Sequence, residues 1–255
     1  MNLHPWVALL ATTFIGVAAQ AETVQLTVSV KNLAAANGVA FAPLHVGFGS
    51  GSFDAFNLGS VAGTAIQSVA EGGAGGAWQA AFAAAEPGAA RGTIGGLLLS
   101  GATASQTFTL DTNSQAFFTF AAMVVPSNDF FIGNDNALRL FDANGALTRS
   151  SLIINANQVW DAGTEVFDPL AAAFVGTNSL RANQNSVVAF NFAELAAFNG
   201  LTTAAGYVFN SGLSAGNDIY QINFALVPVP EPQAAALTLS GLALLGLLMR
   251  RRRPV

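Results

Sequence analysis

Three acidic residues stand in two short segments whose composition suits a hard cation. Asp129 lies in PSNDFFIGNDN, residues 126–136, where acids, asparagines and a glycine directly follow an apolar run. Asp161 and Glu165 lie in WDAGTE, residues 160–165, where one loop can turn both carboxylates to the same side. Calcium takes six to eight oxygen ligands from carboxylates, carbonyls and water. The spacing allows a calcium site, and it also allows plain turns whose Asp and Asn side chains are solvated.

The composition limits the classes of protein that need to be considered. The chain has 255 residues, a formal net charge of −5 and only 9% charged residues. An acidic, weakly charged chain does not attract nucleic acid, so we expect no nucleic-acid partner. There are no cysteines, which excludes disulfides and thiolate chemistry. Abundant phenylalanine and small residues favour an all-β fold over a helical bundle.

Both ends of the chain resemble targeting segments. Residues 1–21 contain an apolar stretch that ends in Ala19-Gln20-Ala21, which predicts a cleaved signal peptide. Residues 228–255 contain Val-Pro-Glu-Pro, then an apolar run, then four arginines at 250–253. This order resembles the PEP-CTERM sorting signal of Gram-negative bacteria, and a plain transmembrane anchor is the alternative.

The resemblance of the tail has consequences for location and partners. It implies recognition and cleavage by an exosortase-type membrane enzyme, after transient anchoring of the tail helix in the inner membrane. It also implies release or attachment at the cell surface or in the extracellular matrix, and an association with exopolysaccharide production.

The segment between the two ends, residues 22–227, reads as one domain. Residues 22–32 alternate between apolar and polar side chains, as a half-buried strand does, and residues 220–226 alternate in the same way. Further strand-like segments are 106–110, 116–125, 138–141, 152–155 and 186–192. They predict an antiparallel β-sandwich.

Two stretches break this β pattern. Apolar residues have helical spacing at 61–69 and again at 78–85, and each stretch ends at glycine or proline. We therefore expect one or two short inserted helices. The glycine- and alanine-rich segment 72–96 predicts a long surface connection.

The two acidic segments also resemble a known module. MVVPSNDFFIG, residues 123–133, followed by WDAGTE is similar to the paired motifs of the spondin domain, the module named after F-spondin. Weaker similarities lie at 28–33, 53–59 and 69–72, so the resemblance covers roughly residues 22–226. It implies a C2-like β-sandwich with calcium held by Asp129, Asp161 and Glu165. Glutamate stands at 165 where the family has aspartate, so the carboxylate is kept on a longer side chain.

The sequence shows no pattern that favours catalysis. His45 is the one histidine beyond the expected signal peptide, and it lies in an apolar, strand-like setting that suits a structural role. No nucleophile elbow, metalloprotease helix or phosphate loop is present.

These observations predict a non-catalytic, calcium-binding adhesion module of the cell surface or matrix, with exopolysaccharide or a surface protein as its partner. One alternative is a structural envelope or biofilm protein that calcium only stabilises. The other is a glycan-active hydrolase with Asp129 and Asp161 as paired carboxylates.

Overall fold

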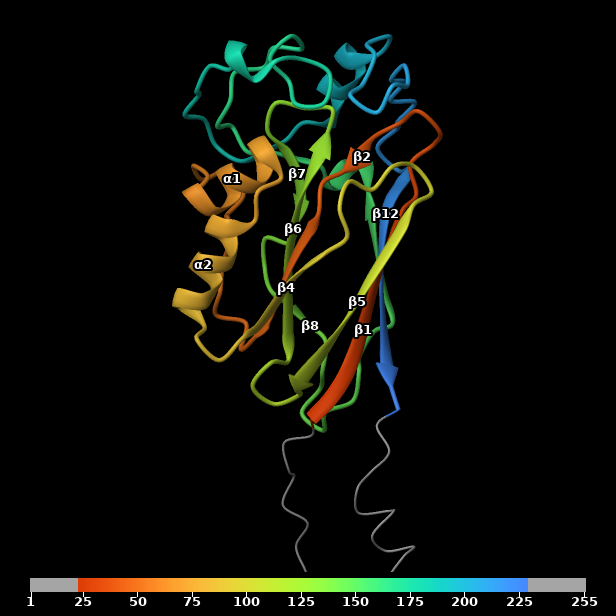
Figure 1. The fold of residues 1–255 in the computed structure, drawn as a ribbon. Helices are drawn as coiled ribbons and strands as arrows, with labels where there is room; N and C mark the ends of the chain where they lie inside the picture. The colour runs from red at the N-terminus through yellow and green to blue at the C-terminus, as the bar shows by residue number, and fades with distance from the viewer. Residues whose placement is uncertain (1–22, 229–255) are drawn as a thin grey trace, which may run out of the picture.

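Two antiparallel sheets make up the core of the protein in a computed structural model that describes residues 23–228 (Figure 1). The smaller sheet has the order β5 (Thr103–Asp111), β1 (Thr23–Asn32), β12 (Asp218–Val227) and β9 (Ser151–Asn155). The larger has the order β11 (Ala189–Phe190), β10 (Trp160–Asp161), β7 (Phe130–Gly133), β6 (Phe117–Val125), β3 (Leu44–Gly49) and β4 (Ala90–Ile94). Short strands β2 (Ala40–Phe41) and β8 (Leu138–Arg139) also pair with β6. The predicted all-β antiparallel sandwich is confirmed.

The smaller sheet has one buried face and one exposed face, as the alternating sequence predicts. In β1, Val24, Leu26, Val28 and Val30 are buried, and the polar residues between them face outward. Leu226 differs from the expectation, because it is 43% exposed at the far end of β12. Burying a large apolar side chain contributes about 1.5–3 kcal/mol, so these inward rows are a main source of stability.

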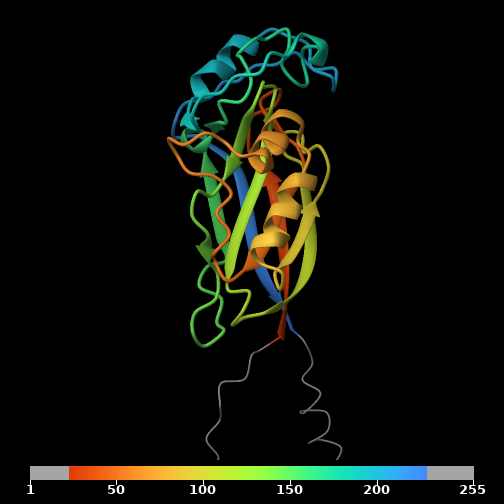
Figure 2. The same cartoon turned by 90° about the vertical axis from the view of Figure 1, so that its left-hand side faces the viewer.

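The larger sheet is covered on both faces. Its inner face packs on the smaller sheet, and its outer face carries α1 (Thr64–Gly72) and α2 (Gly76–Ala85) (Figures 1 and 2). This explains why β6 is almost wholly buried and, apart from Thr119, entirely apolar. The prediction of inserted helices is confirmed.

The expectation that residues 72–96 form a surface connection is wrong. The segment contains α2 and β4, and a side chain at Gly75, directly before α2, would overlap the ring of His45 on β3. A side chain at Gly47 of β3 would overlap the ring of Phe82 from α2. At Gly47 and Gly75 the small residues therefore let α2 pack closely on the sheet.

The sandwich has two different ends. β1 begins and β12 ends at the same end, where Gln25 pairs with Val227. The opposite end is covered by a loop-rich segment with the 3-10 helices η1 (Ala156–Gln158), η2 (Asn178–Leu180) and η3 (Phe192–Phe198) (Figures 1 and 2). We call residues 162–217, which contain η2 and η3, the cap. Of the strand predicted at 186–192, only the two residues of β11 form, and η3 follows at once.

The predicted signal peptide and the predicted membrane helix of the tail lie outside the described residues. Within residues 23–228, no helix has the length and apolar character needed to cross a membrane.

We expect Gly47→Ala to destabilise the fold by about 1–3 kcal/mol, because the new methyl group displaces the ring of Phe82 and overpacks the contact between α2 and β3. Chemical denaturation measures the free energy of unfolding. In a Phe82→Leu background the same change should cost less, because the obstructing ring is gone. An equal cost in both backgrounds would contradict this account of the packing.

Candidate functional site

Three neighbouring strands bring the two acidic segments together at the cap end. β10 pairs with β7, which places Asp161 beside Phe130, the residue after Asp129. β11 pairs with the other side of β10, and Asp161 lies opposite Ala189. Residues 32 positions apart in the chain, Asp129 and Asp161, are therefore neighbours in the fold.

Asp129 is a buried carboxylate that holds the second acidic segment in place. Its side chain is 2% exposed, and Oδ2 accepts hydrogen bonds from the backbone N–H groups of Thr164, at 2.6 Å, and Glu165, at 3.0 Å. The hydroxyl of Thr164 donates to the same oxygen at 3.2 Å. Bonds to an ionised acceptor are stronger than neutral ones, so this carboxylate is a fixed anchor for the 162–165 turn.

The turn itself requires Gly163. Its φ is +66°, a left-handed conformation that other residues rarely adopt, and a side chain there would collide with the backbone of Val187 and Ser186. Oδ1 of Asp161 accepts the N–H of Gly163 at 2.7 Å. The WDAGTE segment is thus a tight turn whatever else it binds.

Burial and, after it, the negative charge of Asp161 raise the pKa of Asp129 to about 7, against the opposing effect of the hydrogen bonds from Thr164 and Glu165. The neighbouring charge of Asp161 therefore adds to the cost of ionising the buried Asp129 carboxyl. A bound cation is one way to relieve that cost.

Two residues of the cap join this pair, and sequence reasoning missed both. Asn191 donates to Oδ2 of Asp161 at 3.5 Å, and burial raises the pKa of Glu194, with the Asp161 charge acting in the same direction. Both lie at the start of η3. No spacing rule links them to Asp161, because the contact depends on the pairing of β10 with β11.

The carboxyl group of Glu165 has different neighbours. Its Oε1 lies 3.4 Å from Nε of Arg181 and 3.3 Å from Nδ2 of Asn128. Burial raises the pKa of Glu165, the hydrogen bond from Asn128 and the charge of Arg181 oppose that change, and Glu71 on α1 adds to it. Oε2 is buried and has no hydrogen-bond partner among the described residues.

The structure therefore brings two of the three expected ligands together. Asp129 and Asp161 share one electrostatic environment, whereas Glu165 faces Arg181 and Asn128. In residues 23–228 no group of three or more acidic, histidine or cysteine side chains lies close enough to hold a metal ion. A cation at Asp129 and Asp161 would need further oxygens from amides, carbonyls or water.

His45 has the structural setting expected from its sequence. It is 3% exposed, and its ring nitrogens lie 3.1 Å from the Thr93 hydroxyl and 3.1 Å from the Gly73 carbonyl. Burial lowers its pKa. Both nitrogens have partners within the protein.

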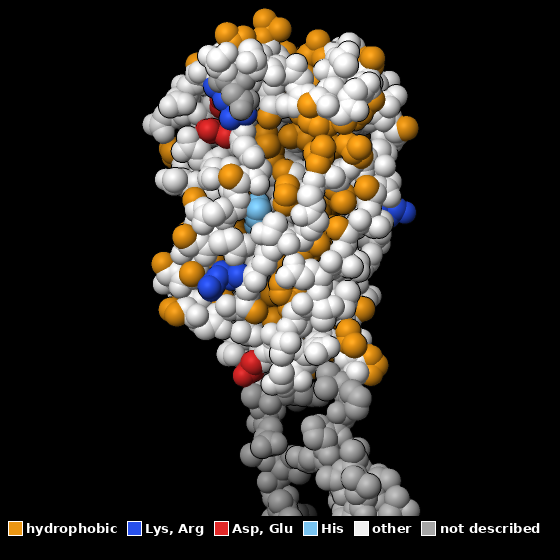
Figure 3. All heavy atoms as spheres, viewed as in Figure 1, with side chains coloured by type: hydrophobic (Ala, Val, Ile, Leu, Met, Phe, Trp, Pro, Cys, Tyr) orange, Lys and Arg blue, Asp and Glu red, His pale blue; other side chains and the backbone are white. Residues whose placement is uncertain are grey.

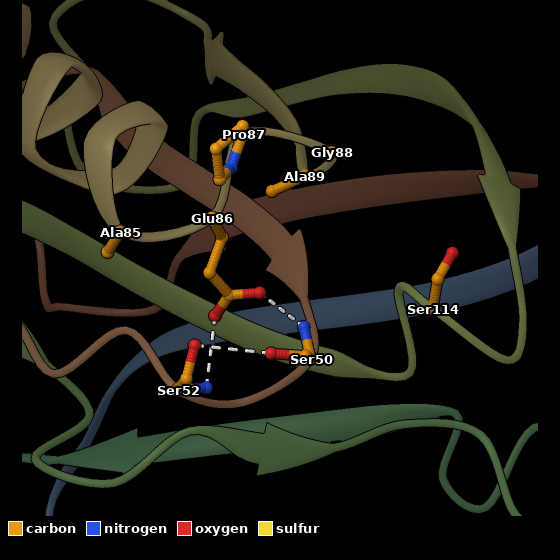
Figure 4. A pocket seen from close by; sticks show the side chains of 8 residues that line it. All are labelled: Ser50, Ser52, Ala85, Glu86, Pro87, Gly88, Ala89 and Ser114. Atoms are coloured by element: carbon orange, nitrogen blue, oxygen red, sulfur yellow. Dashed lines mark hydrogen bonds between the residues drawn. The ribbon is translucent and has the colours of Figure 1, made fainter.

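A small pocket lies at the other end of α2 and contains a second buried carboxylate (Figure 4). Its volume is about 300 Å³, and serines 50, 52 and 114 line it together with Glu86. The Glu86 carboxylate accepts the backbone N–H groups of Ser50, Ser52 and Phe53. Burial, the largest single influence, raises its pKa, but these hydrogen bonds together lower it. Its oxygens serve the 50–53 turn, so we assign Glu86 a structural role.

The comparison with protein families identifies the tail. Residues 228–253 match the PEP-CTERM protein-sorting motif. The match marks an exported protein that is directed to the cell surface and processed by an exosortase-type enzyme. The comparison with curated proteins gave no match. Neither comparison supports the resemblance to the spondin domain, which remains an expectation from the sequence.

We expect the metal-free protein to lose stability as the pH rises from about 4 to 7. The pKa of Asp129 is raised from 3.8 to about 7 on folding, so its protonation favours the folded state below that window and this contribution is lost across it. Asp129→Asn should remove this part of the pH dependence, because the amide is neutral and its oxygen can still accept the turn's N–H groups. Melting temperatures of both proteins in EDTA across the range test this, and a constant difference between them would contradict it.

We expect Glu86→Ala to cost about 2–4 kcal/mol, because it leaves three backbone donors of the 50–53 turn without their acceptor. The depressed pKa means that the contribution of Glu86 is present above its ordinary value near 4.5 and is lost as the pH falls below it. Asp54→Ala, at an exposed acid in the same loop, serves as the control and should change the unfolding free energy little.

Proposed function

We propose that this protein is an exported, non-catalytic binding module of the cell surface or extracellular matrix, and that Ca²⁺ at Asp129 and Asp161 orders its cap. The observation that carries the proposal is the buried Asp129 carboxylate beside Asp161. The host we propose is a Gram-negative bacterium, in which the tail is held in the inner membrane until the exosortase-type enzyme cleaves it.

The donor set fits calcium by its chemistry. The two aspartates supply carboxylate oxygens, which suit a hard cation, and calcium tolerates the irregular geometry of loops. The neighbouring Asn191 turns its amide N–H to Oδ2 of Asp161, so its side chain would have to flip to offer an oxygen. Asp129 and Asp161 would hold the ion, which would neutralise charge that burial makes costly. Millimolar extracellular calcium is enough to fill even weak sites of this kind.

Glu165 enters the proposal as a residue to be tested. The sequence resemblance implies that it is a third ligand, and its buried Oε2 has no partner within the described part of the chain. Its other oxygen is already engaged by Arg181. If Glu165 does not bind calcium, it has a separate role, because it ties the chain at Arg181 to the core.

The position of the site supports an adhesive role. The cap lies at the opposite end of the sandwich from Val227, after which the sorting tail begins. A tail held in a membrane would therefore attach the domain at the end far from the cap. The cap exposes apolar side chains, among them Phe167, Leu170 and Leu180. Figure 3 shows hydrophobic side chains over much of the face in view, with a group of basic and acidic side chains at its upper left. An ordered cap could present this surface to exopolysaccharide or to a surface protein.

A structural envelope or biofilm protein with purely stabilising calcium is the second candidate, because Asp129 already anchors the cap through Thr164 and Glu165. The hydrolase alternative has less support. Asp129 is 2% exposed, and its Oδ2 is occupied by three donors, which leaves little access for a substrate.

We expect calcium to raise the melting temperature of the processed protein relative to EDTA. An ion that binds only the folded state at a hundredfold excess over its Kd adds about 2.7 kcal/mol, or roughly 5–10 °C for a domain of this size. Asp161→Asn should abolish the shift, because it removes a ligand charge and keeps an oxygen for the Gly163 N–H.

The matched control is Glu165→Gln. Loss of the calcium shift in this variant would make Glu165 a ligand, and an unchanged shift would confine the site to Asp129 and Asp161. A wild-type protein whose melting temperature does not respond to calcium would refute the calcium proposal. If the protein binds exopolysaccharide with the same affinity in calcium and in EDTA, adhesion does not depend on calcium.

A further inference from the structure

Strand β5 is a long edge strand without the usual protection. It ends the smaller sheet, runs for nine residues and carries no proline and no charge before Asp111. The other sheet edges differ: β9 has five residues, β11 has two, and β4 carries Arg91. Natural proteins usually protect edge strands with charge, proline, bulges or short length, because an open edge pairs with other strands.

The open hydrogen-bonding groups of β5 can be assigned to particular residues. The N–H of Asn32 on β1 donates to the Ala102 carbonyl at 3.1 Å, so the even-numbered residues of this strand direct their backbone groups toward β1. At the other end, the backbone of Asp111 bonds Gln115 on the outer side. The backbone groups of Thr103, Ser105, Thr107 and Thr109 therefore point out of the sheet, and among residues 23–228 nothing bonds them.

We propose that β5 pairs with β5 of a second copy of this chain, in antiparallel orientation, to form one continuous eight-stranded sheet. The pairing that uses all four open residues sets Thr103 opposite Thr109 and Ser105 opposite Thr107. Each pair exchanges two backbone hydrogen bonds, and Gln106 lies on the two-fold axis. A shift of the pairing by two residues in one direction would place Thr103 opposite Asp111, whose backbone is already bonded to Gln115. A shift in the other direction would place Thr109 opposite Gly101, whose N–H already donates to the Asn32 carbonyl.

The side chains favour a second copy as the partner. All four open residues are exposed hydroxyl residues, so each meets another hydroxyl across the junction and no charge opposes the approach. The same chemistry already joins β5 to β1, where the hydroxyls of Thr27 and Thr107 are 2.8 Å apart. Cross-strand Thr and Ser pairs stabilise antiparallel sheets.

The direction of the pairing has a consequence for adhesion. β5 runs along the long axis of the sandwich, and β12 ends with Val227, next to the matched sorting motif in the chain, at one end of that axis (Figure 1). Antiparallel pairing therefore places the two tails at opposite ends of the dimer. Two copies on facing surfaces can pair in this way, whereas two upright neighbours on one surface cannot. This step rests on the proposed surface location; the pairing itself does not.

Sedimentation velocity of the processed protein over a wide concentration range tests the pairing. We expect a dimer, and we expect Ser105→Lys/Thr107→Lys to raise its dissociation constant about tenfold or more, because each new lysine faces another across the junction. Gln25→Lys/Asn223→Lys adds the same charge to the same face on the inner strands β1 and β12, and it should leave the dimer unchanged.

Cysteine substitution tests the register, since the chain has no cysteine of its own. Gln106→Cys should form a disulfide-linked dimer under mild oxidation, because the two residues at 106 lie directly opposite each other. Thr107→Cys should not, because its partner is Ser105. A monomeric wild-type protein, or a dimer insensitive to the edge lysines, would overturn the proposal, and efficient linkage at 107 but not at 106 would overturn this register.

These readouts are independent of the calcium proposal. The dimer is measured in calcium and in EDTA, and β5 contains none of the candidate ligands. Loss of the calcium-dependent rise in melting temperature with an intact dimer would refute the calcium site alone. Loss of the dimer with an intact calcium response would refute the pairing alone.

Discussion

The cap end of the protein depends on one buried carboxylate. Asp129 accepts hydrogen bonds from the backbone N–H groups of Thr164 and Glu165, at the start of the cap. The pairing of β7 with β10 sets its position. A neutral acceptor could make the same bonds, yet the chain keeps an ionisable group in a place where a second acid, Asp161, opposes its ionisation. Placing the Asp161 charge beside the buried Asp129 raises the free-energy cost of ionising Asp129. Because holding the turn does not require this second charge, the pair points to a functional site.

The same interaction explains which parts of the site could be predicted. The sequence led us to expect that the two acidic segments belong together, and the pairing of β10 with β7 does place Asp161 beside Phe130, next to Asp129. The orientation of the Glu165 carboxyl could not be predicted, because it depends on Arg181, which reaches it from a part of the cap with no regular pattern. Asn191 and Glu194 were inaccessible for a similar reason, since the two-residue strands β10 and β11 are too short to leave a periodic signal.

The fold shows the same limit at a larger scale. Strands with one exposed face, such as β1 and β12, alternate clearly and were predicted with nearly correct bounds. β3 is buried along its whole length and contains two glycines, so it shows neither alternation nor strong strand propensity. Its glycines are there for α2, because Gly47 and Gly49 leave room for Phe82 and Glu86. Because these glycines are required by residues far away in the sequence, the sequence around them does not indicate a strand.

The small number of charged residues affects both the interior and the surface of this protein. Several of the few acids, Glu86, Asp129 and Glu165, are buried. Glu86 and Asp129 accept backbone N–H groups that no strand satisfies, and Glu165 pairs with Arg181 and Asn128. Acids used in this way are not available to protect the surface, and the exposed face of the smaller sheet is left with hydroxyl and amide groups and few charges. In a cytoplasm crowded with other chains, such an edge would risk nonspecific pairing. The sorting motif directs this protein to the outside of the cell. There an uncharged strand edge can instead serve as a binding surface, because no charge repels the same edge of a second copy and the register of the backbone hydrogen bonds sets how the two edges align.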